Sequence, residues 1–163
     1  MEWMEEYLNE AERMITDNRV EEGVRLLNSL LYEEPGSESL HNHLGWAHMY
    51  YTQNMKKAEL HLTMSLRFNA AYAPPYLHLG QLCNRMARYS EAIGYFEKGL
   101  SIAGANRTAL MEGLAFAYEM KNEFRAAIRH YREAVASASG YEVQQLSEGI
   151  KRCRSKRWIR WFG

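Results

Sequence analysis

Cysteine and the glycine motifs of nucleotide-binding enzymes are scarce or missing in this sequence. Only Cys83 and Cys153 occur among 163 residues, and they form no closely spaced pair of the metal-binding or redox type. A reducing compartment is therefore expected. The sequence also has no Gly-x-Gly combination, no phosphate-binding loop and no paired catalytic carboxylates. We therefore expect neither enzymatic activity nor a cofactor.

Long apolar runs are also missing. No stretch approaches the roughly 18–20 apolar residues that are needed to cross a bilayer. The first residues, 1–6, are acidic and lack the basic segment and apolar run of a secretory signal. Together with a composition that is 47% hydrophobic and 25% charged, these features predict a folded cytoplasmic protein.

The sequence has no net charge, but its charges are unevenly distributed. A formal charge of zero gives the whole chain no bias toward nucleic acid or an anionic membrane, so neither is favoured as a partner. Residues 1–40 hold eleven acidic and three basic residues, whereas residues 141–163 hold two acidic and six basic ones. This asymmetry raises the hypothesis of self-association through an acidic N-terminal end and a basic C-terminal end.

Small residues recur with a fixed period. The first set is spaced by 34, 35 and 35 positions, and a second set follows it by twelve or thirteen: Ala11, Gly45, Gly80 and Ala115, then Gly23, Ala58, Ala92 and Ala127. Around each pair the apolar residues follow helical spacing. Small side chains let two helices approach closely, so each unit is predicted to be a pair of antiparallel helices.

This pattern resembles the tetratricopeptide repeat (TPR). The third unit carries Tyr76-x-x-Leu79-Gly80 followed by Ala92-x-x-x-Phe96. The fourth carries Leu114-Ala115-x-x-Tyr118 followed by Ala127-x-x-x-Tyr131, and the first two units match less completely. The resemblance implies an all-α fold, a right-handed α-solenoid of about four TPR helical hairpins plus a C-terminal capping helix. It implies a single TPR domain over 1–163, with units at about 4–37, 38–72, 73–107 and 108–140 and a capping helix with a basic aromatic tail at 141–163.

Helix breakers fall near the unit junctions. Pro35-Gly36, Pro74-Pro75 and Gly104 interrupt the helical pattern. Ser37 and Asn106 are predicted to be N-caps of the helices that follow them.

The resemblance also nominates a binding groove. First helices of successive TPR units line a concave face, and side chains off the packing side meet a ligand. In this sequence those positions are Asn42, Trp46, Met49, Tyr50, Leu77, Gln81, Asn84, Arg85, Glu112, Phe116, Glu119 and Met120. Aromatic and Met side chains supply adaptable contact area, and Arg85 is the one cation among them. The groove is therefore predicted to bind an extended apolar peptide or an amphipathic helix, which would make the protein an adaptor or scaffold for a protein or peptide partner.

The histidines are not predicted to bind a metal. His41, His43 and His48 lie close together, but they lack the i, i+4 pair with a nearby carboxylate that metal-binding helices use. His41 and His48 occupy positions where the repeat takes an aromatic residue. Packing or surface roles are therefore expected, and Cys83, which replaces the Tyr of the repeat, is expected in the core.

The C-terminal tail allows several interpretations. Its cations and aromatics are Lys151, Arg152, Arg154, Lys156, Arg157, Trp158, Arg160 and Trp161. In the favoured interpretation the cations stabilise the C-terminal end of the capping helix, while Trp158, Trp161 and Phe162 pack against the last repeat. The alternatives are contact with an acidic protein surface, with nucleic acid as an accessory protein, or with a membrane. A noncatalytic subunit or chaperone in a larger complex is a further alternative function.

Overall fold

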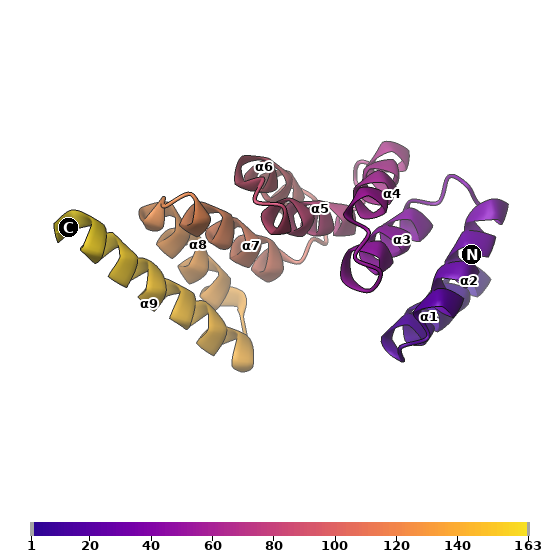
Figure 1. The fold of residues 1–163 in the computed structure, drawn as a ribbon, viewed down its shortest axis with the longest axis horizontal. Helices are drawn as coiled ribbons and strands as arrows, with labels where there is room; N and C mark the ends of the chain where they lie inside the picture. Colours follow the sequence, from indigo (N-terminus) through magenta and orange to yellow (C-terminus); the bar gives the residue numbers. More distant parts are fainter. Residues whose placement is uncertain (1, 163) are drawn as a thin grey trace. The chain divides into compact units, whose positions relative to one another are not determined.

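A computed structural model describes the backbone of residues 2–162 and the side chains of residues 3–159. The backbone described is helical throughout, apart from short connections (Figure 1). The helices are α1 (Glu2–Thr16), α2 (Val20–Glu33), α3 (Glu38–Tyr50), α4 (Met55–Phe68), α5 (Pro74–Arg85), α6 (Tyr89–Leu100), α7 (Arg107–Met120), α8 (Phe124–Ser137) and α9 (Tyr141–Phe162). This order confirms the prediction of four helical hairpins followed by a capping helix.

The chain forms two compact units, which we call unit 1 (Met1–His78) and unit 2 (Leu79–Gly163). The boundary between them falls within α5. Each unit has its own hydrophobic core.

Side-chain caps start the helices where the sequence predicts them. Ser37 Oγ accepts a hydrogen bond from the backbone N–H of Leu40 at 3.3 Å, and Asn106 Oδ1 accepts one from that of Ala109 at 3.1 Å. Both predicted N-caps are therefore confirmed. They satisfy donors that the first turn of a helix leaves without an intrahelical partner.

The turn inside each hairpin places one non-glycine residue in the left-handed backbone region. These residues have φ between 53° and 66° and recur every 34 or 35 positions: Asn18, Gln53, Ala87 and Asn122. In the third hairpin, the N–H of Arg88 donates to the carbonyl of Cys83 at 2.8 Å. Such a bond closes a Schellman motif and ends the first helix. Asparagine favours this conformation at two of the four turns, whereas Gln53 and Ala87 do not reveal it by residue type.

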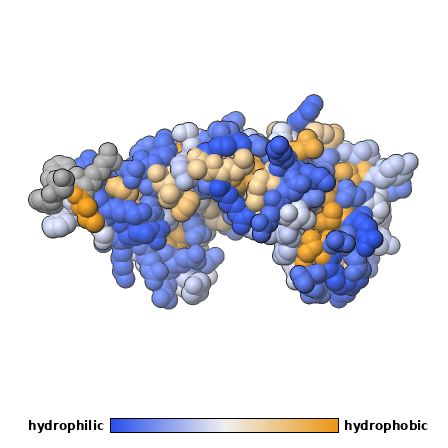
Figure 2. Space-filling model, viewed as in Figure 1, coloured by the Kyte–Doolittle hydropathy of each residue, from blue (hydrophilic) through white to orange (hydrophobic). Residues whose placement is uncertain are grey.

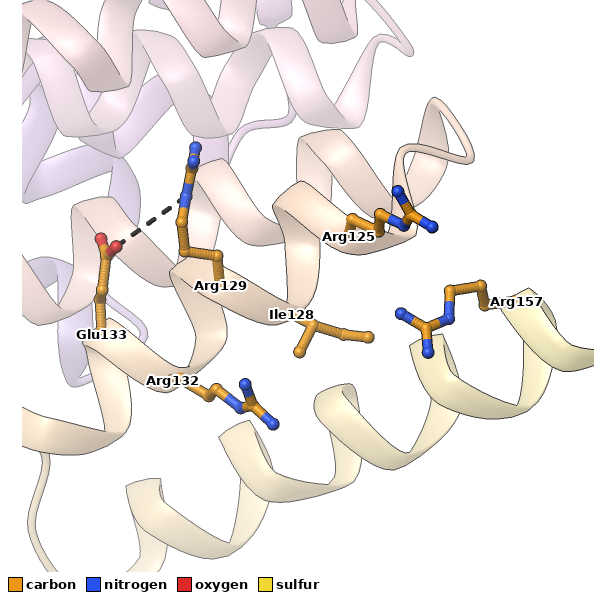
Figure 3. A pocket seen from close by; sticks show the side chains of 6 residues that line it. All are labelled: Arg125, Ile128, Arg129, Arg132, Glu133 and Arg157. Carbon is orange, nitrogen blue, oxygen red and sulfur yellow. Dashed lines mark ion pairs between the residues drawn. The ribbon is translucent and has the colours of Figure 1, made fainter.

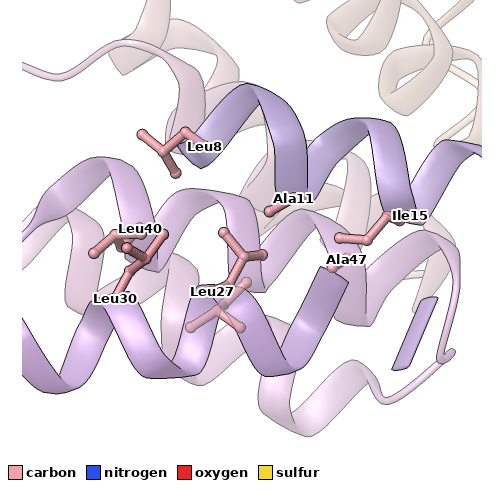
Figure 4. Packing of buried hydrophobic residues seen from close by; sticks show 8 residues of the cluster. Leu8, Ala11, Ile15, Leu27, Leu30, Leu40 and Ala47 are labelled. Carbon is pink, nitrogen blue, oxygen red and sulfur yellow. The ribbon is translucent and has the colours of Figure 1, made fainter. Parts of the chain in front are cut away.

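The core of unit 1 joins three helices (Figure 4). Its buried residues come from α1, α2 and α3: Leu8, Ala11, Ile15, Leu27, Leu30, Leu40, Leu44 and Ala47. Gly23 shows why a small residue is needed there. A Cβ atom at Gly23 would lie 2.5 Å from Ile15 Cγ1 and 2.7 Å from the carbonyl oxygen of Ala11, so α1 and α2 would have to move apart.

In unit 2, glycines are needed where helices pack around the buried ring of Phe96. Phe96 is fully buried, and a Cβ atom at either Gly80 or Gly113 would overlap its ring. Phe96 of α6 therefore fits between a glycine of its own hairpin and a glycine of the next one. A Cβ atom at Gly149 would likewise lie 2.8 Å from the ring of Tyr131, so α9 packs on α8 through the same kind of contact.

The surface combines hydrophilic residues with separate apolar patches. Figure 2 shows hydrophobic side chains exposed in patches on one face of the molecule. Within the described residues, no helix combines the length and apolar character that crossing a bilayer requires.

Candidate protein-binding surfaces

The nominated groove positions of α3 differ in exposure. Met49 is fully buried and Asn42 is 5% exposed, so both belong to the interior of unit 1. Trp46 is partly buried against the unit 1 core, and its ring lies edge-on to that of Tyr51 with centroids 5.0 Å apart. Tyr50 is exposed. Of the nominated α3 side chains, Tyr50 therefore offers the most surface to a ligand.

The nominated positions of α5 fall on both sides of the unit boundary. Leu77 belongs to unit 1 and is partly buried, as are Gln81 and Asn84 in unit 2, whereas Arg85 is exposed. The Asn84 side-chain amide donates to the carbonyl of Gly113 at 3.0 Å. Asn84 therefore connects α5 to α7 in addition to any role toward a ligand.

On α7 two apolar side chains stand out from the surface. Phe116 and Met120 are 38% and 40% exposed, and a spacing of four residues places them on one helix face. Glu112, one turn before Phe116, is partly buried, and its burial together with the charge of Glu142 raises its pKa. Phe116 and Met120 form an apolar pair, which we call the α7 patch.

Glu119, also nominated for the groove, is held inside unit 2. Its carboxylate is 2% exposed and accepts hydrogen bonds from Arg152 Nε at 2.7 Å, Arg152 Nη2 at 2.8 Å and Lys156 Nζ at 2.8 Å. The Tyr131 hydroxyl donates a further bond at 3.1 Å. We call this arrangement the Glu119 network; it ties α9 to α7 and α8.

The Glu119 network shifts the pKa values of the residues in and around it. Burial alone would raise the pKa of Glu119, but the bonds and charges of Arg152 and Lys156 outweigh it and lower the pKa to about 2. Burial and the Glu119 charge raise the pKa of Tyr131, and they also raise the pKa of the buried Cys153 thiol to about 12. At neutral pH the network therefore holds a charged carboxylate, two cations, a neutral phenol and a neutral thiol.

The tail residues divide between inward and outward positions. Arg152 and Lys156 reach Glu119 in the last hairpin. Trp158, which the favoured interpretation of the tail packs against the last repeat, is instead 66% exposed. Lys151, Arg154, Arg157 and Trp158 are exposed. The side chains of Arg160, Trp161 and Phe162 lie outside the described residues.

Three histidines form a cluster that the sequence analysis did not identify as a group. His41 and His48 of α3 meet His61 of α4: the Nδ1 atoms of His41 and His61 lie 3.1 Å apart, and the rings of His48 and His61 stack with centroids 5.7 Å apart. Burial and the neighbouring histidines lower the pKa of His61 to about 4. Burial also lowers the pKa of His41 and of His48, so all three rings are neutral at pH 7.

The histidine cluster is part of the packing of unit 1. His41 and His48 are buried, as expected for residues at aromatic positions of the repeat, and His43 is partly buried with Nδ1 2.8 Å from the Ser39 carbonyl. Cys83 is fully buried, as predicted. Among the described residues, no group of three His, Cys, Asp or Glu side chains is placed to hold a metal ion.

A cationic cleft lies between α8 and α9 (Figure 3). This arginine cleft has a volume of about 320 Å³ and is lined by Arg125, Ile128, Arg129, Arg132, Glu133 and Arg157. Arg129 turns toward Glu133, with Nε 4.0 Å from a carboxylate oxygen. The other three guanidinium groups make no ion pair within the described part of the chain, which leaves an uncompensated positive surface.

Comparison with solved structures identifies the fold. Antiparallel helix pairs with small residues recurring every 34 or 35 positions define a helical-repeat protein. PilF from Pseudomonas aeruginosa is similar at a TM-score of 0.81 with 14% identity, over 93% of this chain and 69% of that one. A thermophilic TPR protein of Thermus thermophilus, TTC0263, is similar at a TM-score of 0.74 with 17% identity, over 86% and 77%. This chain therefore has the tetratricopeptide-repeat fold.

A further similarity extends over almost the whole chain. A chain of MamA from Desulfovibrio magneticus RS-1 that runs from residue 41 to the end is similar over 95% of this chain and 91% of that one, at a TM-score of 0.73 with 17% identity. No protein-family model matches the sequence, and no curated protein matches it by sequence. At these identities the similarity establishes the fold alone.

Proposed function

We propose that this protein is a binding scaffold that holds a protein partner, and that the partner contributes a peptide or an amphipathic helix. The observation that carries the proposal is the α7 patch. Phe116 and Met120 are exposed on the first helix of a TPR hairpin. The other exposed large apolar side chains of unit 2 lie in the turn after α5 or on α9: Met86, Tyr141, Trp158 and Ile159. Exposed aromatic and Met side chains cost solvation energy, and a ligand that covers them recovers it.

In unit 1, aromatic side chains at nominated groove positions of α3 are also accessible to a ligand. Tyr50 on α3 is exposed and Trp46 is partly so. In unit 2, Arg85 and Gln81 add polar groups that would fix the register of a bound chain, while the apolar side chains would supply the affinity.

Alanine substitution of the α7 patch tests the proposal. The purified chain would be used to capture partners from lysate of its source organism and to select binders from a library of extended and helical peptides. Phe116→Ala with Met120→Ala should weaken binding by about 2 kcal/mol or more, roughly thirtyfold. Trp46 is a poorer test site because it also packs on the unit 1 core.

A matched control uses apolar side chains on second helices. Leu60 of α4 and Tyr32 of α2 are exposed like the α7 patch but lie off the first helices, so Leu60→Ala with Tyr32→Ala should leave binding unchanged. Equal loss in both double variants, with circular dichroism unchanged, would move the binding surface away from α7.

A second candidate is a noncatalytic subunit or chaperone of a larger complex. PilW, which is similar at a TM-score of 0.78 with 14% identity, is a type IV pilus biogenesis factor. Recovery of several subunits in a constant ratio, rather than one peptide-bearing partner, would favour this role. Self-association through oppositely charged ends also belongs to the proposal, since residues 1–40 are acidic and the arginine cleft is basic.

A further inference from the structure

The arginine cleft concentrates positive charge without a local partner. Arg125, Arg132 and Arg157 all line it, and the sole acidic residue among its lining side chains, Glu133, is already engaged by Arg129 and by His130 at 3.3 Å. Like charges held close together destabilise a surface unless an anion binds there. The cleft therefore selects for an anionic occupant.

The spacing of the arginines indicates the form of that occupant. Arg125 and Arg132 are seven residues apart on α8, which places them on one face about 10 Å apart along the helix axis. Arg129 lies between them, but its charge is met by Glu133. A matching partner therefore presents two carboxylates about 10 Å apart with no charge needed between them.

The first helix of this chain carries that pattern. Glu5, Asn9 and Glu12 lie along one exposed face of α1 at intervals of four and three residues. The two carboxylates are again seven residues apart, and the uncharged Asn9 occupies the position between them. Glu12 lies 4.0 Å from His43 Nε2, yet half of its side chain, 50%, is exposed.

Aromatic side chains occupy a different exposed face of α1, because Trp3 and Tyr7 are each rotated by about 200° from Glu5 around the helix. Trp3 and Tyr7 on α1 are 46% and 48% exposed and stand edge-to-face with ring centroids 6.2 Å apart. The face of α1 that carries Glu5 and Glu12 therefore offers two carboxylates for Arg125 and Arg132, and the aromatic pair lies outside this contact.

We infer that the arginine cleft of one copy binds the acidic strip of α1 in a second copy. Because the two surfaces are different, the contact is heterologous and leaves one cleft and one strip open in each pair, so that further copies can add. The inference rests on the proposed scaffold function and specifies its self-association. It uses a surface separate from the α7 patch.

Charge reversal at either surface tests the contact in the full-length chain. Analytical ultracentrifugation of the unmodified protein should show mass that increases with concentration and decreases with salt. Two variants are compared with it: a cleft variant, Arg125→Glu with Arg132→Glu, and a strip variant, Glu5→Arg with Glu12→Arg. Each should be monomeric at concentrations where the unmodified protein associates, because its association is weakened by about tenfold or more.

Mixing the two variants is the decisive step. The cleft variant retains its strip and the strip variant retains its cleft, and the reversed cleft of one complements the reversed strip of the other. An equimolar mixture should therefore associate in alternating order and gain mass with concentration, although each variant alone does not. All four substitutions in one chain should restore association, because both charges are then reversed. The α7 patch variant, Phe116→Ala with Met120→Ala, should assemble like the unmodified protein, which separates failure of this contact from failure of the groove.

The opposite results would overturn the inference. An unmodified protein that stays monomeric at every concentration and salt would do so, as would a variant mixture that does not associate. Binding of RNA or of anionic phospholipid vesicles that requires Arg125 and Arg132, in a protein that remains monomeric, would assign the cleft to a different anion.

Discussion

Removal of the Glu119 charge should loosen the capping helix without unfolding the chain. Glu119→Gln keeps the size of the side chain but removes the charge that Arg152 and Lys156 meet. A carboxyl pKa lowered from 4.5 to about 2 corresponds to about 3 kcal/mol of stabilisation at neutral pH. Since Arg152 and Lys156 are 47% and 45% exposed, solvent screens their side of the contact, and we expect a loss of about 2 kcal/mol.

Hydrogen exchange followed by mass spectrometry gives the local readout. A loss of about 2 kcal/mol should accelerate exchange of α9 amides roughly thirtyfold, while unit 1 amides exchange as before. Glu123→Gln is the matched control, because Glu123 is exposed and pairs with Lys121 at the surface at 3.1 Å; its effect should stay within about 0.5 kcal/mol.

The electrostatic origin of the faster α9 exchange in Glu119→Gln is checked by repeating the comparison with the unmodified protein at lower pH. The folded-state pKa of Glu119 is lowered, so its stabilisation is fully present above pH 4.5 and is lost as the pH falls toward 2. The difference between the unmodified protein and Glu119→Gln should therefore disappear across this window. An α9 exchange rate equal in both proteins at pH 7, or accelerated equally by Glu123→Gln, would refute the reasoning.

The other predictions concern packing, backbone and protonation. Gly113→Ala should lower the free energy of unfolding by about 2 kcal/mol, because its Cβ atom would overlap the buried Phe96 ring. A Cβ atom at Gly94 would have no other atom within 4 Å, so Gly94→Ala should raise the free energy of unfolding by about 0.5–1 kcal/mol through helix propensity. Urea denaturation of both variants measures these changes. Ala87→Gly should stabilise by about 1 kcal/mol in the same assay, because Ala87 has φ of 56°. Since the folded-state pKa of His61 is lowered to about 4, the melting temperature of the unmodified protein should fall as pH drops from about 6.5 toward 4. His61→Phe should reduce this dependence of the melting temperature on pH. An unchanged dependence would contradict the lowered pKa of His61.

The helical framework is readable from the sequence because its constraints are local. Recurrent small residues mark where two helices touch, and Gly80 does so by facing Phe96, as the repeat pattern predicts. Ser37 and Asn106 cap helices because their side chains reach an N–H three residues later. Each of these relations lies within one hairpin or between neighbouring hairpins, at a separation that the repeat fixes.

Contacts that depend on the register of one helix against another could not be predicted in this way. Ala87 gives no sign of a left-handed turn, because alanine does not favour that conformation. His61 was missed because it follows His41 by twenty residues and belongs to another helix. Its proximity to His41 and His48 follows from how α4 packs on α3.

Glu119 shows how such a contact changes the interpretation of a whole segment. Position alone places Glu119 with the ligand-facing residues of first helices, but cations 33 and 37 positions later occupy it. Arg152 and Lys156 are one helical turn apart and so share the face of α9 that meets α7, whereas Arg157 is rotated by about 100° from Lys156 and lines the cleft beside α8. The inward cations of the tail therefore hold α9 against α7, and α9 in turn holds Arg157 beside the arginines of α8. Within the described residues, Arg125, Arg132 and Arg157 make no ion pair there.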